Sequence, residues 1–149
     1  MMKIGLASDH AGFAIKEHAK QYLMRLGYEC HDFGTHSADS CDYPDFAHPL
    51  ACAVERGDCP LGLAVCGSGE GISMTLNKHQ GIRAALCWRP DVASLSRQHN
   101  DANVLVLPGR FVSETEADAI IDAFLGANFE GGRHQRRIDK IPLPDACHD

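Results

Sequence analysis

The chain has 149 residues, of which 44% are hydrophobic, and a formal net charge of −6. This length and apolar content predict one compact domain, spanning residues 1–149, with a core of its own. The negative charge argues against nucleic acid as a partner, because a phosphate backbone requires a broad surface rich in Lys and Arg. No stretch approaches the ~20 apolar residues of a membrane-spanning helix, so we expect no membrane partner either.

The seven cysteines are odd in number and include no Cys-x-x-Cys pair. Their number and spacing therefore support neither a disulfide framework nor a zinc ribbon. The apolar run at the start of the chain is also too short for the core of a signal peptide. We therefore expect reduced thiols and a cytoplasmic location.

Short apolar runs alternate along the chain with longer segments of helical period. The runs predict strands at residues 4–7, 30–33, 61–66, 84–87 and 104–107. One apolar face from Ile15 to Leu26, followed by Gly27, predicts the first helix. Ser113 and Glu116 form a capping box that opens a second clear helix. Weaker patterns predict helices at residues 43–55, 69–77, 91–99 and 133–140. This alternation is typical of a parallel sheet covered by crossover helices.

Open α/β sheets bind ligands beyond the carboxyl ends of their strands. We expect three polar clusters at this edge, at residues 8–12, 66–71 and 96–101. The first is Ser8-Asp9-His10-Ala11-Gly12, directly after the first strand. Taken alone, Asp9 is more typical of a helix cap and His10 of a solvated loop residue. A functional interpretation of this turn therefore depends on its neighbours.

The second cluster, Cys66-Gly67-Ser68-Gly69-Glu70-Gly71, leads from a buried strand into a glycine-rich turn and a helix. Amides at a helix N-terminus can hold a phosphate or a developing oxyanion, and the same field favours a thiolate at Cys66. The alternative is a small hydrophobic cysteine before a tight turn. The turn matches neither a Walker loop nor the dinucleotide fingerprint. Glu70 either complements the helix dipole or moves a substrate proton.

The third cluster, Ser96-Arg97-Gln98-His99-Asn100-Asp101, ends the fourth helix. Histidine is a side chain suited to acid–base chemistry, and Asn100 can hydrogen-bond a hydroxyl. A histidine such as His99 at a helix C-terminus, however, often only complements the dipole. Later in the chain, Arg133 and Arg137 fall on one face at helical spacing and could together bind a phosphate group. The alternatives for this charged run are a solvated face and a short nucleic-acid contact.

With these residues assembled, the chain resembles the type B ribose-5-phosphate isomerases, which share a family with allose- and galactose-6-phosphate isomerases. The motifs that carry the resemblance are Ser8-Asp9-His10-Ala11-Gly12, Asp42-Tyr43-Pro44, Cys66-Gly67-Ser68-Gly69, Asn77-Lys78, Gly81-Ile82-Arg83-Ala84, Ser96-Arg97-Gln98-His99-Asn100-Asp101 with Asn103, and Glu130-Gly131-Gly132-Arg133-His134. The resemblance implies a Rossmann-like three-layer αβα sandwich with a five-stranded parallel sheet and a C-terminal helix. It also implies no metal or organic cofactor, and homodimers or homotetramers with active sites between subunits.

The activity that the resemblance implies is the interconversion of D-ribose 5-phosphate and D-ribulose 5-phosphate through an enediolate. Cys66 is then the base that acts on carbon, His99 opens the furanose ring with Asp9 as a candidate partner, and Ser68 helps to hold the enediolate. The implied substrate contacts are Asp9, His10, Tyr43, Gly67, Ser68, Gly69, Glu70, Gly71, Asn100, Arg110, Arg133 and Arg137. Two residues depart from many relatives, which have threonine in place of Ser68 and a small or apolar residue in place of Glu70. The second departure could alter sugar preference.

Three other functions are weighed against this one. The sugar phosphate could have six carbons, as in the allose and galactose members of the family. A non-catalytic sugar-phosphate sensor would keep the fold without needing both Cys66 and His99. A cysteine phosphatase would need an arginine at position 72, where Ile72 stands.

Overall fold

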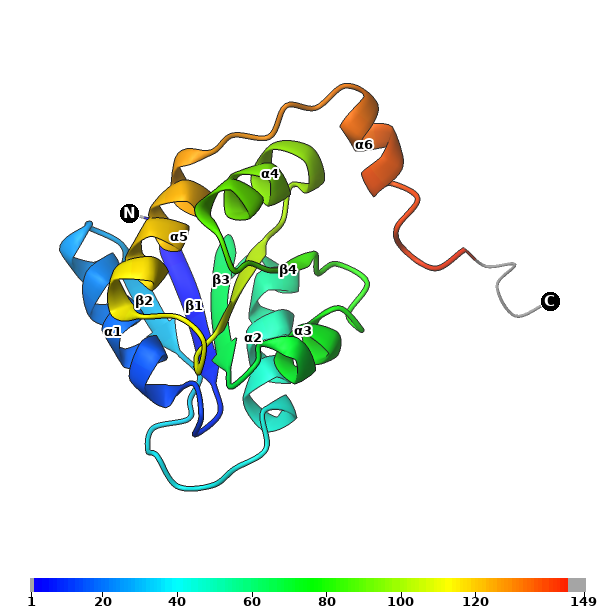
Figure 1. Ribbon diagram of the computed structural model, residues 1–149. Coiled ribbons are helices and arrows are strands. Elements are labelled where there is room, and N and C mark those ends of the chain that lie inside the picture. Colours follow the sequence, from blue (N-terminus) through cyan, green and yellow to red (C-terminus); the bar gives the residue numbers. More distant parts are fainter. Residues whose placement is uncertain (1, 145–149) are drawn as a thin grey trace.

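The computed structural model describes residues 2–144, which form a parallel sheet between two layers of helices (Figure 1). The elements are β1 (Lys3–Ser8), α1 (Phe13–Arg25), β2 (Glu29–Asp32), α2 (Pro44–Arg56), β3 (Leu61–Cys66), α3 (Glu70–Leu76), β4 (Ala84–Leu86), α4 (Pro90–Asn100), β5 (Val104–Pro108), α5 (Glu114–Gly126) and α6 (Arg133–Ile138). The predicted three-layer αβα fold with a five-stranded parallel sheet and a C-terminal helix is confirmed. Residues 1 and 145–149 of the expected single domain lie outside the described part of the chain.

The strand order is β2-β1-β3-β5-β4, and every neighbouring pair is parallel. Ile4 of β1 lies opposite Leu61 of β3, and Cys66 at the end of β3 lies opposite Pro108 at the end of β5. The three central strands therefore end together, and we call this side of the sheet the carboxyl edge. The opposite side, where the strands begin, is the amino edge.

Two apolar clusters hold the helices on the sheet. Helices α1, α4 and α5 cover one face through buried residues that include Leu23, Ala93 and Ile120. Helices α2 and α3 cover the other face through residues that include Leu50 and Ile72. A helix that packs on a sheet buries only one side, so its apolar residues recur with helical period. This is the pattern from which the helices were predicted.

A buried ion pair fixes the loop that follows β2. The Lys16 side chain is fully buried, and its ammonium group donates hydrogen bonds to the Asp32 carboxylate at 2.7 and 2.9 Å and to the Thr35 carbonyl. The Thr35 N–H donates to the Ser8 carbonyl at 2.8 Å, so this network supports the end of β1. Burial alone would raise the pKa of Asp32, but hydrogen bonds from Lys16 and Lys20 outweigh it and lower that pKa.

The predicted boundaries agree with the structure to within a few residues. The capping box of α5 is present, with the Ser113 hydroxyl and the Glu116 carboxylate each accepting a backbone N–H of the other residue at 3.0 Å. Strand β4 ends at Leu86 rather than residue 87, and α6 ends at Ile138 rather than residue 140. Such small shifts are usual, because terminal turns have few packing contacts to define them.

Candidate active site

A pocket of about 410 Å³ lies at the carboxyl edge of the sheet. Its walls come from the turns after β1, β3 and β5 and from the start of α2. The lining residues are Asp9, His10, Ala11, Tyr43, Cys66, Gly67, Ser68, Gly71, Arg110 and Phe111. We call this the carboxyl-edge pocket. It brings the first two predicted clusters together, as the topology requires of turns that follow neighbouring parallel strands.

The turn after β1 contributes a carboxylate and an imidazole. Asp9 is 7% exposed, and its Oδ1 accepts the Gly12 N–H at 3.0 Å, so it does cap the turn into α1. The cap occupies one of its two carboxylate oxygens. Nδ1 of His10 accepts the Cys41 N–H at 3.2 Å. The neutral ring of His10 therefore carries its proton on Nε2, which is a hydrogen-bond donor.

The turn after β3 holds the thiol and the glycines. Cys66 is 4% exposed at the end of its strand. Gly69 has φ 78°, a left-handed conformation that side chains disfavour, and it starts α3. A Cβ on Gly71 would lie 2.4 Å from the Tyr43 ring, so glycine there allows the tyrosine to pack over the turn. Glu70 is exposed at the first position of α3 and does not line the pocket.

The turn after β5 closes the pocket with a cation. The Gly109 N–H donates to the Cys66 carbonyl at 2.8 Å, and the Arg110 N–H donates to the Gly67 carbonyl at 2.9 Å. The guanidinium of Arg110 lies against Gly67, where a Cβ would be 3.2 Å from it. The pocket therefore combines a thiol, a carboxylate, a glycine-rich turn and a guanidinium group. This set suits an anionic, hydroxyl-rich ligand.

The expected position of the third cluster at the carboxyl edge is wrong. A helix between two parallel strands runs opposite to them, so α4 begins near the carboxyl edge and ends at Asn100 near the amino edge. The Asn103 carbonyl accepts the Gly62 N–H at the start of β3, which fixes this segment at the amino edge. His99 and Asn100 therefore lie away from the carboxyl-edge pocket of the same chain.

The sheet itself sets the separation of these groups. Cys66 lies opposite Pro108, and β5 begins four residues earlier at Val104. At about 3.3 Å per residue, the two edges are roughly 13 Å apart. A general acid or base must come within ~2.6–3.2 Å of the proton that it transfers. One chain therefore does not bring Cys66 and His99 to adjacent atoms of one sugar.

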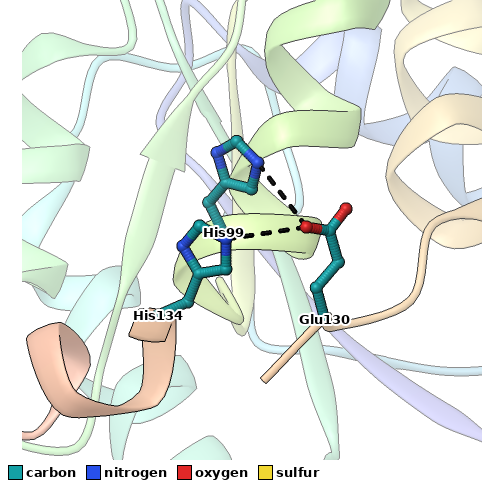
Figure 2. A group of neighbouring side chains, drawn as sticks. All are labelled: His99, Glu130 and His134. Carbon is teal, nitrogen blue, oxygen red and sulfur yellow. Dashed lines mark ion pairs between the residues drawn. The ribbon is translucent and has the colours of Figure 1, made fainter. Parts of the chain in front are cut away.

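At the amino edge, His99 belongs to a cluster with residues from the end of the chain (Figure 2). The ring of His99 stacks on the ring of His134, with 4.3 Å between centroids and 11° between planes. Glu130 Oε1 lies 3.9 Å from Nε2 of His99 and 3.5 Å from Nε2 of His134. Burial, the nearby His99 and the charge of Arg133 lower the pKa of His134. We call His99, Asn100, Glu130, Arg133, His134 and Arg137 the amino-edge cluster.

Helix α6 presents its two faces as its sequence predicts. His134 and Ile138 are buried, whereas Arg133, Arg136 and Arg137 are exposed. Arg133 and Arg137 therefore point away from the core, on the same helix as His134. Figure 1 places α6 at the side of the molecule opposite the turns that follow β1 and β3.

Three thiols away from the pocket are in surroundings that disfavour the thiolate form. Burial raises the pKa of Cys87 to about 11. Burial also raises the pKa values of Cys30 and Cys59. Only Cys66, among the cysteines of the described residues, lines the pocket with the glycine-rich turn.

Known proteins identify the family to which these residues belong. A model of the Ribose/Galactose Isomerase family matches residues 4–141. The chain belongs to this family. The ribose-5-phosphate isomerase B of Escherichia coli (strain K12) is 47% identical over 141 residues, which cover 95% of each chain.

Solved structures of family members match both the fold and the sequence. The crystal structure of a ribose 5-phosphate isomerase from Thermotoga maritima matches with a TM-score of 0.93 and 49% identity, over 95% of this chain and 97% of that one. The ribose-5-phosphate isomerase B of Mycoplasma genitalium, crystallised with bound ribulose-5-phosphate, matches with a TM-score of 0.89 and 45% identity, over 94% and 93% of the two chains.

The predicted residues of this family member divide between the two edges. The residues that line the carboxyl-edge pocket are Asp9, His10, Tyr43, Cys66, Gly67, Ser68, Gly71 and Arg110. The glycine-rich turn also holds Gly69 and Glu70, which lie outside the lining. The amino-edge cluster includes His99, Asn100, Arg133 and Arg137. Sequence reasoning missed Phe111 in the pocket and the contacts of Glu130 and His134 with His99. Glu130 precedes α6, so no helical pattern in the sequence signalled its contacts with His99 and His134. Within residues 2–144, no helix is long and apolar enough to cross a membrane.

Proposed function

We propose that the protein interconverts D-ribose 5-phosphate and D-ribulose 5-phosphate, and that each active site is built from two chains. The observation that carries the proposal is the family membership, with about half of the sequence shared with ribose-5-phosphate isomerases over nearly the whole chain. The carboxyl-edge pocket supplies the thiol and the glycine-rich turn that this reaction needs. The amino-edge cluster of a second chain supplies the imidazole and the arginines.

Ring opening requires two proton transfers on the cyclic sugar. His99 of one chain donates a proton to the ring oxygen, and Asp9 of the other receives the proton of the anomeric hydroxyl. The C1–O bond of the ring breaks and C1 becomes a carbonyl carbon. The Asp9 carboxylate has an oxygen besides the one that accepts the Gly12 N–H at 3.0 Å, which supports this role.

Isomerisation then moves one proton between neighbouring carbons. The Cys66 thiolate takes the proton from C2, and negative charge develops on the C1 oxygen. The amides of residues 67–71 and the Ser68 hydroxyl stabilise this enediolate, which exists only on the way to product. The thiol returns its proton to C1 while the proton of the C2 hydroxyl passes to the C1 oxygen. The reaction therefore neither consumes nor releases protons.

The phosphate group holds the sugar in register without reacting. We assign it to His10 of the pocket and to Arg133 and Arg137 of the second chain, while Tyr43, Asn100 and Arg110 contact the sugar. Guanidinium groups suit a phosphate dianion because they offer paired donors. Binding energy at this remote group fixes C1 and C2 over Cys66.

The surface of α4 supports pairing between copies of the chain. Val92, Leu95 and His99 follow each other at helical spacing on one side of α4, and the first two are 43% and 46% exposed. A hollow of about 480 Å³ beside the edge strand β4 is lined by Val92, Leu95, Asn100 and Ile141, among others. An apolar surface that continues to His99 favours a homodimer, or a homotetramer made of two dimers, over a monomer. We also propose a cytoplasmic location, in keeping with the odd number of cysteines.

A coupled assay tests the function. Ribose 5-phosphate, allose 6-phosphate and galactose 6-phosphate are supplied in turn, and formation of each ketose is followed. We expect turnover of ribose 5-phosphate at the highest kcat/KM. Preference for a six-carbon substrate would assign the protein to the other branch of the Ribose/Galactose Isomerase family. Binding without any change in the aldose-to-ketose ratio would identify a sensor.

A further inference from the structure

The amino-edge cluster holds three metal-ligating side chains, which come from the end of α4, the segment before α6 and α6 itself (Figure 2). We propose that His99, Glu130 and His134 bind a divalent transition-metal ion, best matched by zinc, and that this ion inhibits the enzyme. One donor atom of each residue lies within 4.8 Å of the other two. The inhibition rests on the proposed function, whereas the binding does not.

His134 supplies the most specific sign of a ligand. It is 7% exposed, and among the described residues its Nε2 has no hydrogen-bond partner. Glu130 Oε1 is the nearby acceptor, at 3.5 Å. A buried ring nitrogen without a partner is costly, and native structures rarely retain one. A metal ion at this point would occupy the nitrogen and draw the carboxylate toward it.

Small movements of two side chains close the site. Zinc–nitrogen bonds of ~2.0–2.1 Å in a tetrahedral site place neighbouring donor atoms roughly 3.3–3.5 Å apart. Glu130 Oε1 lies 3.5 and 3.9 Å from the two imidazole nitrogens. The stacked rings of His99 and His134 hold their nitrogens side by side, so one ring must turn before both nitrogens can bind the same ion. His99 and Glu130 have side chains that are 41% and 52% exposed, and they are free to do so while His134 stays fixed.

The donor set selects the kind of metal. Two imidazoles and one carboxylate suit zinc, cobalt, nickel and copper, whereas magnesium and calcium prefer all-oxygen sites. Arg133 and Arg137 stand on the same short helix and oppose any cation by charge. Affinity must therefore come from coordination to nitrogen, which again favours the transition metals. Once its nitrogen coordinates the ion, His99 cannot transfer the proton that opens the sugar ring.

A second group of two histidines and a glutamate provides a matched control. His79 Nε2 lies 2.7 Å from His48 Nδ1, and His79 Nδ1 lies 3.0 Å from Glu55. Both nitrogens of His79 are therefore already engaged with protein partners. This group has the same residue types as the proposed site, but its donors face each other rather than a common point.

A calorimetric titration of the full-length protein with zinc chloride tests the binding. Cobalt chloride provides a second probe, because its visible absorption reports tetrahedral coordination. We expect one ion per chain, no displacement by excess magnesium, and at least about tenfold weaker binding in both Glu130→Gln and His134→Gln. His48→Gln should bind zinc as the unmodified protein does. Since His134 is buried, Glu130→Gln at the exposed position decides the outcome if His134→Gln fails to fold.

Three results would overturn the site: no zinc binding, equal binding in Glu130→Gln, or loss of binding in His48→Gln. For inhibition, the zinc concentration that halves turnover should rise at least about tenfold in Glu130→Gln. Zinc acting on the Cys66 thiol would inhibit both proteins equally and would refute the inhibitory role. An active isomerase that binds no zinc would refute this inference alone, and a zinc-binding protein without isomerase activity would refute the proposed function alone.

Discussion

Mixing two inactive variants tests whether the two edges of different chains form one active site. Cys66→Ala removes the proton carrier at the carboxyl edge, and His99→Asn removes the imidazole at the amino edge. The edges of one chain are roughly 13 Å apart, as four residue steps of β5 at about 3.3 Å each require. In a two-fold dimer of one chain of each kind, one site therefore carries both lesions and the other carries neither.

The expected recovery follows from random pairing. Mixing the two chains after unfolding makes half of the dimers mixed, and each mixed dimer has one intact site of two. Activity should therefore approach about a quarter of the unmutated enzyme from two nearly inactive parents. The measurement is a coupled assay of ribose 5-phosphate turnover, with mixed dimers counted by native mass spectrometry.

A second pair of variants is the control. His99→Asn and Arg137→Ala both fall in the amino-edge cluster, so every site of their mixed dimer carries one lesion and activity should not recover. Mixed dimers of Cys66→Ala and His99→Asn that form but remain as inactive as the parents would refute the shared site. Each site would then be built within one chain, which the distance between the two edges of the sheet argues against.

Three further results follow from the structure. Cys66→Ala should bind ribose 5-phosphate with little change yet lose turnover, since the phosphate contacts remain. Turnover close to that of the unmutated enzyme would refute the role of Cys66 as the base. Iodoacetamide should label Cys66 before Cys87, because the pKa of about 11 keeps Cys87 a thiol. Bound substrate should protect Cys66. Equal labelling rates would contradict a reactive thiolate at Cys66. Asp32→Asn should lower the free energy of unfolding in urea by ~3–5 kcal/mol, because it leaves the ammonium of Lys16 buried without its carboxylate, and a loss below ~1 kcal/mol would refute this. The Asp32 carboxylate has a lowered pKa in the folded state, so its contribution is complete above the ordinary aspartate pKa and is lost as pH falls through the lower folded value.

The sequence predicted the elements well because each one buries a regular apolar face. The period of Ile15 to Leu26 and the capping box at Ser113 are local signals, and both led to correct helices. Turns that follow neighbouring parallel strands must meet, so Asp9 and Cys66 were correctly expected in one pocket. The third cluster was misplaced because its polar residues resemble those of the pocket, while the direction of α4 carries them to the other edge.

The contacts of Glu130 could not be predicted from periodicity. It stands between α5 and α6 in a segment with no repeating pattern, and its backbone N–H donates to the Gln98 carbonyl at 3.0 Å. That bond fixes the segment beside α4, and it depends on how the chain returns from α5 rather than on any local preference. Phe111 was missed for a related reason, because an exposed aromatic residue after β5 resembles an ordinary surface residue.

The different exposure of the two proposed catalytic groups agrees with a site completed by a second chain. Cys66 is 4% exposed at the end of a central strand, where its surroundings are already formed within one chain. The side chain of His99 is 41% exposed and stands beside the exposed Leu95 on α4. A site from which water is largely excluded strengthens the electrostatic interactions that act on a transferred proton. Cys66 has that environment without a partner, whereas His99 acquires it only when another chain covers α4. The same exposure leaves His99 free to turn toward Glu130 and His134, so the ring oxygen of the sugar and a metal ion would compete for one imidazole.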